Sequence, residues 1–167
     1  MGIFAIRLSV QPNIEVTVMT LEIILSASHI LLIMGWVSFL AAQTALSHAD
    51  WMNVAVLRRL LRLDYFAWLC ALLLLLSGVL RLFLGLKGWD FFATQWALYL
   101  KITVFGSLLL IEFWVSLQYR LWWRAHEADA TLPDGPHIRN VRKALMLQTH
   151  LMIVLPILGA LLSRGVF

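Results

Sequence analysis

The amino-acid sequence predicts an all-α fold, a four-helix transmembrane bundle, and two observations carry this prediction. Of its 167 residues, 62% are apolar and only 13% are charged, whereas an average globular domain is roughly 45–50% apolar and about 25% charged. A chain this short cannot bury so much apolar surface in a single core, so the surplus must face lipid. Four stretches are also long enough to cross a bilayer as helices, which takes roughly 20 residues each.

The composition excludes several classes of protein. A soluble enzyme and a disordered chain do not fit this apolar content, and the single cysteine, Cys70, excludes both an internal disulfide and a zinc site built from cysteines. The net charge is +4, an excess that in a membrane protein reports loop orientation rather than nucleic-acid binding. The expected partner is therefore the lipid bilayer, and no nucleic acid is expected.

The chain divides into a short N-terminal extension, residues 1–18, and one membrane domain, residues 19–167. The extension contains Arg7, Pro12 and Glu15, so it is too polar and too interrupted to span a membrane. A translation start at Met19, which would remove the extension, stays open. Charges or turn residues bound the four expected spans, which lie at residues 21–46, 65–86, 96–117 and 144–162.

Two connections between the spans carry most of the basic residues. Residues 53–63 alternate arginines with apolar residues, so they are expected to lie as an amphipathic segment on the anionic inner surface. Residues 120–143 form a polar segment with a turn at residues 133–136. Because Lys and Arg concentrate on the cytoplasmic side, both termini are predicted on the outer, periplasmic side.

Ionisable residues inside the spans are the candidates for function, because a charge at the bilayer centre costs at least about 2.5–3.5 kcal/mol. In the first span Glu22, His29, Trp36 and Gln43 recur every seven residues and form one stripe. Helix rise then sorts the ionisable residues of all spans by depth into two groups. These are an outer cluster of Glu22, His29, Arg81 and Lys101, and an inner cluster of Asp64, Glu112 and His150.

The outer cluster fits a tetrapyrrole site inside a helix bundle. In this interpretation His29 binds the haem iron, and Lys101 is a second ligand or a proton-transfer group. Arg81 and Lys87 would pair with the propionates. The alternative is that Glu22, Arg81 and Lys101 form buried ion pairs while His29 hydrogen-bonds between helices.

The inner cluster has two interpretations as well. Glu112, His150 and Asp64 could form a proton path, with His150 as a less favoured second haem ligand. The alternative, which is favoured here, is a pair between Glu112 and His150 that fixes the packing of the last two helices.

Two short runs carry a resemblance to a known family. The run SHILLIMGW at residues 28–36 resembles the first helix of HemJ-type protoporphyrinogen oxidases, four-helix bacterial membrane proteins in which a tryptophan follows a histidine by seven residues. The run WALYLK at residues 96–101 resembles the segment that carries the family's lysine. The resemblance implies that a b-type haem binds His29, with Lys101 as its essential partner, and that the reaction oxidises protoporphyrinogen.

Over most of residues 19–167 the chain is more similar to an uncharacterised bacterial four-helix membrane family that is distantly similar to HemJ. The matching stretches are residues 59–64, 78–83, 87–92, 141–143 and 150–165. This resemblance implies the bacterial inner (cytoplasmic) membrane as location and implies no activity.

The leading hypothesis is a b-type haem-binding membrane redox protein, and if it is an enzyme it is an oxidoreductase. Its substrate would be protoporphyrinogen or a quinol-like molecule of the lipid phase. Lys101 and Arg81 are the candidate catalytic residues, and with His29 and Trp36 they are the candidate haem-binding residues. The alternative is a cofactor-free membrane scaffold or an accessory subunit; a homo-oligomer and a larger membrane complex both stay open.

Overall fold

The computed structural model describes residues 2–84 and 88–164, with side chains described between residues 16 and 162 except at positions 18 and 88. All regular structure in this part of the chain is helical. The elements in chain order are α1 (Gly2–Leu46), the 3-10 turn η1 (Ala49–Trp51), α2 (Val54–Leu84), α3 (Gly88–Ala93), α4 (Trp96–Asp129), α5 (Gly135–Met152) and α6 (Val154–Arg164).

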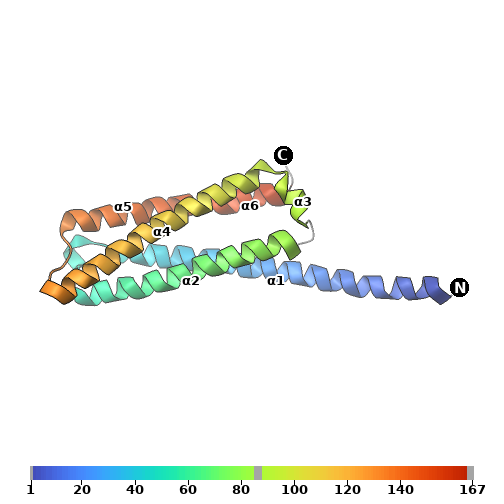
Figure 1. Cartoon of the computed structure of the whole chain (residues 1–167), viewed down its shortest axis with the longest axis horizontal. Helices are drawn as coiled ribbons and strands as arrows, with labels where there is room; N and C mark the ends of the chain where they lie inside the picture. Colours follow the sequence, from blue (N-terminus) through green and yellow to red (C-terminus); the bar gives the residue numbers. More distant parts are fainter. Residues whose placement is uncertain (1, 85–87, 165–167) are drawn as a thin grey trace.

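Four long helical rods, formed by α1, α2, α4 and the α5–α6 pair, run along a common axis (Figure 1). Each contains a stretch long and apolar enough to cross a membrane; the stretches are Met19–Leu46, Val54–Leu84, Trp96–Asp129 and Gly135–Leu162. Large apolar side chains cover the outside of the rods, among them Leu31 and Leu110, which are 67% and 72% exposed. Such a surface is stable only against lipid, so the predicted four-helix transmembrane bundle is confirmed.

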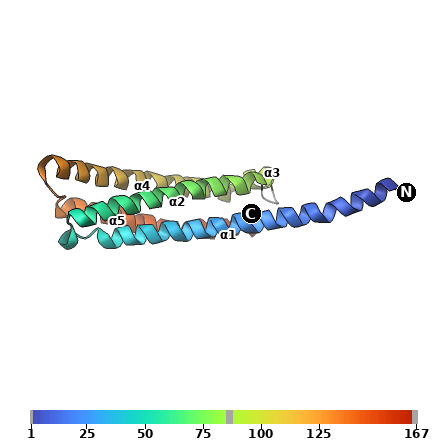
Figure 2. The same ribbon diagram turned by 90° about the horizontal axis from the view of Figure 1, so that it is seen from below.

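The first helix is longer than its expected span. Helix α1 runs without a break from Gly2 to Leu46, so residues 2–18, the expected extension, are helical and continuous with the helix that contains the first candidate span, Met19–Leu46. Its N-terminal part projects beyond the other helices in both views (Figure 2). Turn η1 and the α4–α5 connection lie at the opposite end of the bundle, called here the loop end. Which end faces the cytoplasm stays a prediction from the Lys and Arg distribution.

Helix α2 begins eleven residues before the expected start of the second span, at Val54. Residues 54–63, which were expected on the membrane surface, are therefore its first turns. Asn53 starts the helix, because its Oδ1 accepts the backbone N–H of Val56 at 3.0 Å. Leu57 and Leu60 on this part are fully buried, so core packing holds the segment in the bundle.

The expected long polar connection at residues 120–143 is also mostly helical. Helix α4 continues to Asp129, where Ala130 adopts a left-handed conformation (φ 54°) and donates its N–H to the His126 carbonyl at 2.9 Å. Helix α5 begins after Asp134, whose side chain accepts the backbone N–H of His137 at 3.0 Å. Only the short turn between these two caps leaves helical geometry.

The fourth rod consists of two helices instead of one. Pro156 has no N–H to donate to the carbonyl four residues earlier, that of Met152, and its ring crowds this carbonyl. Helix α5 accordingly ends at Met152 and α6 begins at Val154. The intervening Ile153 donates its N–H to the His150 carbonyl at 3.2 Å, as in a tighter turn.

Among the residues that the structure describes, the apolar core has two parts. The larger part lies toward the loop end and includes Trp36 of α1, Leu60 of α2 and Leu108 of α4. A small second part joins Leu98 of α4 to Leu162 of α6 at the other end. Along α4, Lys101 falls between Leu98 and Leu108, so the outer cluster interrupts the core between its two parts.

Candidate functional site

His29 lies on α1 where this helix packs against α2, and it is 7% exposed. Its Nδ1 is 2.8 Å from the Oγ of Ser77 on α2. The Ser77 hydroxyl donates its own hydrogen to the Leu74 carbonyl, 2.9 Å away, so it accepts from His29 and the proton of the neutral imidazole is assigned to Nδ1. The lone pair is then on Nε2, a nitrogen through which histidine commonly binds metals.

Gly78, the residue after Ser77, lies beside the same imidazole. A methyl group placed on Gly78 would be 3.6 Å from His29 Cε1, which is ordinary van der Waals contact. The α2 backbone thus approaches the ring on one side, and a side chain larger than a methyl group at Gly78 would displace it.

Glu22 and Arg81 form an ion pair between α1 and α2, on the side of His29 away from the loop end. Arg81 Nη2 donates to Glu22 Oε1 at 3.3 Å, and Ser26 donates to the same oxygen at 3.4 Å. Both charged side chains are partly buried. The second carboxylate oxygen of Glu22 and the Nε of Arg81 have no hydrogen-bond partner among the described residues.

Lys101 completes the outer cluster from α4. Its ammonium lies close to α6, since a methyl group placed on Gly159 would be 3.5 Å from Nζ. Lys101 and Arg81 are both near enough to His29 to act on its charge state. Within the described part of the chain Lys101 makes no ion pair. The structure thus pairs Glu22 with Arg81 and places Arg81 and Lys101 within electrostatic reach of His29; a shared ligand site for these residues stays a prediction.

Two further residues expected at the haem site are not placed with the outer cluster. Lys87 lies outside the described residues. Trp36 lies two helical turns further along α1, where it is fully buried and packs edge-on against Phe105 with ring centroids 5.8 Å apart. Its indole is near Glu112 of the inner cluster.

Glu112 is fully buried on α4, but its partner is not the expected one. Gln148 Nε2 donates to Glu112 Oε2 at 2.5 Å and also lies 3.3 Å from the Leu108 carbonyl. His150 is exposed, and its Nδ1 lies 2.6 Å from the carbonyl of Met146 on its own helix. The expected pair of Glu112 with His150 is therefore wrong.

The periodicity of α5 explains the error. Its buried residues follow one another at three or four positions; they are Ile138, Val141, Leu145, Gln148 and Met152. Gln148 lies on this stripe, whereas His150, two residues later, is about 200° around the helix and faces away from the bundle. The three-to-four-residue spacing of the apolar positions in α5 places Gln148 on the buried face. It was not predicted because an amide is not ionisable and the candidates were ionisable residues.

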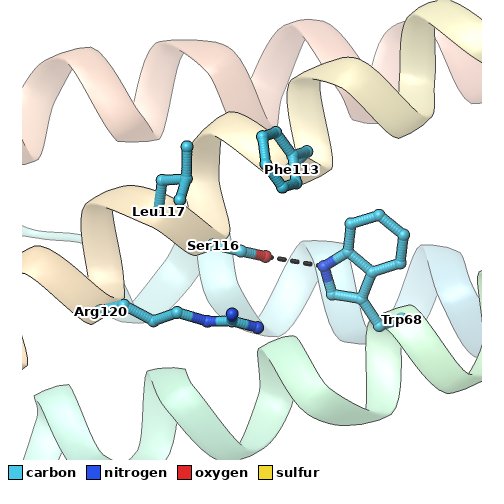
Figure 3. A pocket seen from close by; sticks show the side chains of 5 residues that line it. All are labelled: Trp68, Phe113, Ser116, Leu117 and Arg120. Atoms are coloured by element: carbon cyan, nitrogen blue, oxygen red, sulfur yellow. Dashed lines mark hydrogen bonds between the residues drawn. The ribbon is translucent and has the colours of Figure 1, made fainter.

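Asp64 of α2 is buried and belongs to a hydrogen-bonded chain. Ser116 of α4 donates to Asp64 Oδ1 at 2.5 Å, and Trp68 Nε1 donates to Ser116 Oγ at 2.7 Å. Ser116 and Trp68 also line a small pocket of about 80 Å³ between α2 and α4 with Phe113, Leu117 and Arg120 (Figure 3). This volume admits a water molecule or two. Ser116 and Trp68 carry no charge, so they were not among the ionisable residues predicted as candidates for function.

No group of three or more His, Cys, Asp or Glu residues that could hold a bare metal ion occurs within the described part. A haem iron needs less from the protein, since the macrocycle supplies four nitrogens and one imidazole completes a five-coordinate site.

A comparison with protein families matches residues 21–167 to a family described as "Predicted membrane protein (DUF2214)". The match covers nearly the whole membrane domain, and the chain belongs to this family. No curated protein and no solved structure shows significant similarity to the chain.

Proposed function

We propose that this member of a membrane-protein family is a b-type haem-binding redox protein of the bacterial inner membrane, with His29 as iron ligand. The observation that carries the proposal is the hydrogen bond from His29 Nδ1 to Ser77, which leaves the Nε2 lone pair free. Metal-binding histidines almost always donate their other ring nitrogen in this way, because the bond fixes tautomer and ring orientation.

The charges around His29 suit a ligand with carboxylates. Glu22 already neutralises Arg81, so Lys101 is the cation of the outer cluster left to pair with a propionate or a substrate group. When bound, a b-type haem supplies one-electron exchange. The protein's own share is to hold the imidazole through Ser77, to pack the α2 backbone at Gly78 beside the ring, and to offer a proton at Lys101 Nζ.

The substrate class follows from the surroundings of the site. The outer cluster lies within apolar helices, so a substrate that reaches it from the lipid phase must itself be lipid-soluble. A quinol-like molecule or protoporphyrinogen meets this condition, and the second agrees with the resemblance of residues 28–36 and 96–101 to HemJ-type oxidases.

A cofactor-free scaffold or accessory subunit is the second candidate, and one observation favours it. Glu22 with Arg81, and His29 with Ser77, are already paired within the protein, as interhelical contacts of a purely structural bundle would be. In this case the partner would be another subunit of a membrane complex.

The test is a visible absorption spectrum of the detergent-purified protein, oxidised and dithionite-reduced, from a haem-sufficient host. The expected result is a Soret band with split α and β bands on reduction and about one haem per chain. A colourless protein without porphyrin in an acid extract contradicts haem binding and favours the scaffold. If haem is present, an assay of protoporphyrinogen and quinol oxidation follows.

A further inference from the structure

Four fully buried polar side chains meet inside the bundle, and we call this group the Glu112 chamber. It consists of Trp36 and Gln43 from α1, Glu112 from α4 and Gln148 from α5. Gln148 Nε2 donates to Glu112 Oε2 at 2.5 Å. Trp36 and Gln43 are near enough to interact with the same carboxylate, but neither completes a hydrogen bond of normal geometry.

Several polar atoms of the Glu112 chamber have no partner among the described residues. They are Glu112 Oε1, Trp36 Nε1, Gln43 Oε1 and Nε2, and Gln148 Oε1. Buried polar atoms are nearly always hydrogen-bonded, to protein or to ordered water. The set contains both donors and acceptors, and water satisfies both kinds at once, whereas a bare metal cation would leave the N–H groups unpaired.

The electrostatic surroundings of Glu112 also favour a bound proton. The charged or titratable groups that act on Glu112 are Asp64 of α2 and Tyr119 of α4, while α1 and α5 contribute uncharged side chains. No cation pairs with Glu112 in the described part of the chain. An isolated carboxylate is very costly in an apolar interior, and a proton removes that cost.

Polar side chains lie between the Glu112 chamber and the side of the bundle. Ser116 lies four residues after Glu112, one turn further along the same face of α4. Its hydroxyl donates to Asp64 and lines the water-sized pocket beside Arg120 (Figure 3). Pocket, Ser116–Asp64 pair and Glu112 therefore follow one another from the bundle surface inward.

From this arrangement we infer that Glu112 is a hydrated proton-binding site in the membrane interior, loaded from the Arg120 pocket through Ser116 and Asp64. In the loading step a hydronium ion delivers a proton through the bound waters, an O–H bond forms on Glu112, and water remains; no electrons move. The exposed His150 takes no part. The inference does not depend on haem at His29.

Infrared difference spectroscopy of the full-length protein during acidification tests the inference. Among the carboxylic C=O bands that appear, one component is expected to be absent from Glu112→Gln and to remain in Asp64→Asn and in the control Glu22→Gln. Glutamine matches the shape of Glu112 and can still accept from Gln148. Identical carboxylic C=O bands in wild type and Glu112→Gln overturn the inference.

A second measurement on the wild-type chain does not depend on the folding of Glu112→Gln. Transfer to D2O is expected to shift the band, and Ser116→Ala is expected to slow this shift, because the route through Ser116 is interrupted. A band insensitive to D2O means no access from solvent and contradicts the inference. Loss of the band when sodium replaces choline at constant pH assigns the site to a metal cation and contradicts it too.

Discussion

His29 and Ser77 illustrate how one hydrogen bond determines what a buried side chain can do. An isolated imidazole in a bundle can donate or accept on either nitrogen. The Ser77 hydroxyl is committed to the Leu74 carbonyl, so His29 must donate through Nδ1. The chemistry left to His29 is therefore that of an Nε2 acceptor.

Substitutions at this pair test the haem site directly. His29→Ala is expected to lose the haem, and Ser77→Ala to weaken it by roughly 10–100-fold, the usual effect of removing a residue that orients a metal ligand. The measurement is haem per chain from the absorption spectrum after purification. His150→Ala serves as the control, since His150 is exposed; equal loss in His29→Ala and His150→Ala would indicate ligation by both histidines.

Gln148 is the residue whose loss should most disturb the inner part of the bundle. Gln148→Leu removes the amide that donates to the Glu112 carboxylate at 2.5 Å. Leaving a buried acceptor unpaired costs about 1–3 kcal/mol, so thermal unfolding in detergent should shift to lower temperature. His150→Leu on the same helix faces outward and should leave the transition unchanged; similar shifts in both variants would contradict the assignment of Gln148 as the partner.

At the scale of elements, the start of α5 depends on a single carboxylate. The backbone N–H of His137, and then its imidazole, hold the pKa of Asp134 below its usual value of 3.8. Because the pKa of Asp134 is lower in the folded than in the unfolded chain, its stabilising effect is complete above the unfolded-state pKa. The effect is lost as the pH falls through the lower, folded-state pKa.

The pH dependence of unfolding gives the test. Asp134→Ala should lower the unfolding temperature near neutral pH, because the cap is lost, and the difference from wild type should shrink on acidification. Asp134→Asn keeps a capping oxygen without a titrating group, so it should retain stability in acid better than wild type. A difference between wild type and Asp134→Ala that is independent of pH would contradict the role of this carboxylate.

Contact between α1 and α2 relies on a glycine. A methyl group at Gly35 would lie 3.3 Å from the Sγ of Cys70, which is closer than most side chains tolerate, whereas one at Gly106 would meet nothing within 4 Å. Gly35→Leu should therefore destabilise the bundle by about 1–3 kcal/mol through overpacking. Gly106→Leu is the matched control and should not be destabilised in the same unfolding assay, since leucine has the higher helix propensity; an equal loss of stability in both variants would contradict packing at Gly35 as the cause.

At the scale of the whole molecule, the structure places η1 and the α4–α5 turn together at the loop end. The Lys and Arg distribution predicts that this end is cytoplasmic. In a Cys70→Ala background, Asp50→Cys should react with an impermeant maleimide only in inverted vesicles, and Thr94→Cys only in spheroplasts. Both native positions are exposed. The reverse pattern would invert the topology without changing the fold.

The sequence was sufficient for the helical class and for the four candidate membrane spans, because the requirement for lipid-facing surface acts on every residue of a span. Heptad spacing on α1 also placed His29, Trp36 and Gln43 on one buried face of this helix, whereas the ligand site proposed for His29 and Lys101 stays a prediction. Helix ends were predicted less well. The arginines of residues 54–63 indicated a segment on the membrane surface and the polar end of α4 indicated a loop, yet Leu57, Leu60 and Trp122 belong to the apolar core and extend both helices.

What the sequence determined by itself is the membrane bundle and the stripe that carries Glu22, His29, Trp36 and Gln43, because hydropathy and helical period are properties of one segment at a time. The tertiary structure alone decided the partners. Whether Glu112 meets Gln148 or His150, and whether His29 meets Ser77, depends on the rotation of one helix against another. That rotation is decided by the sum of many packing contacts across the interface, which no single segment encodes.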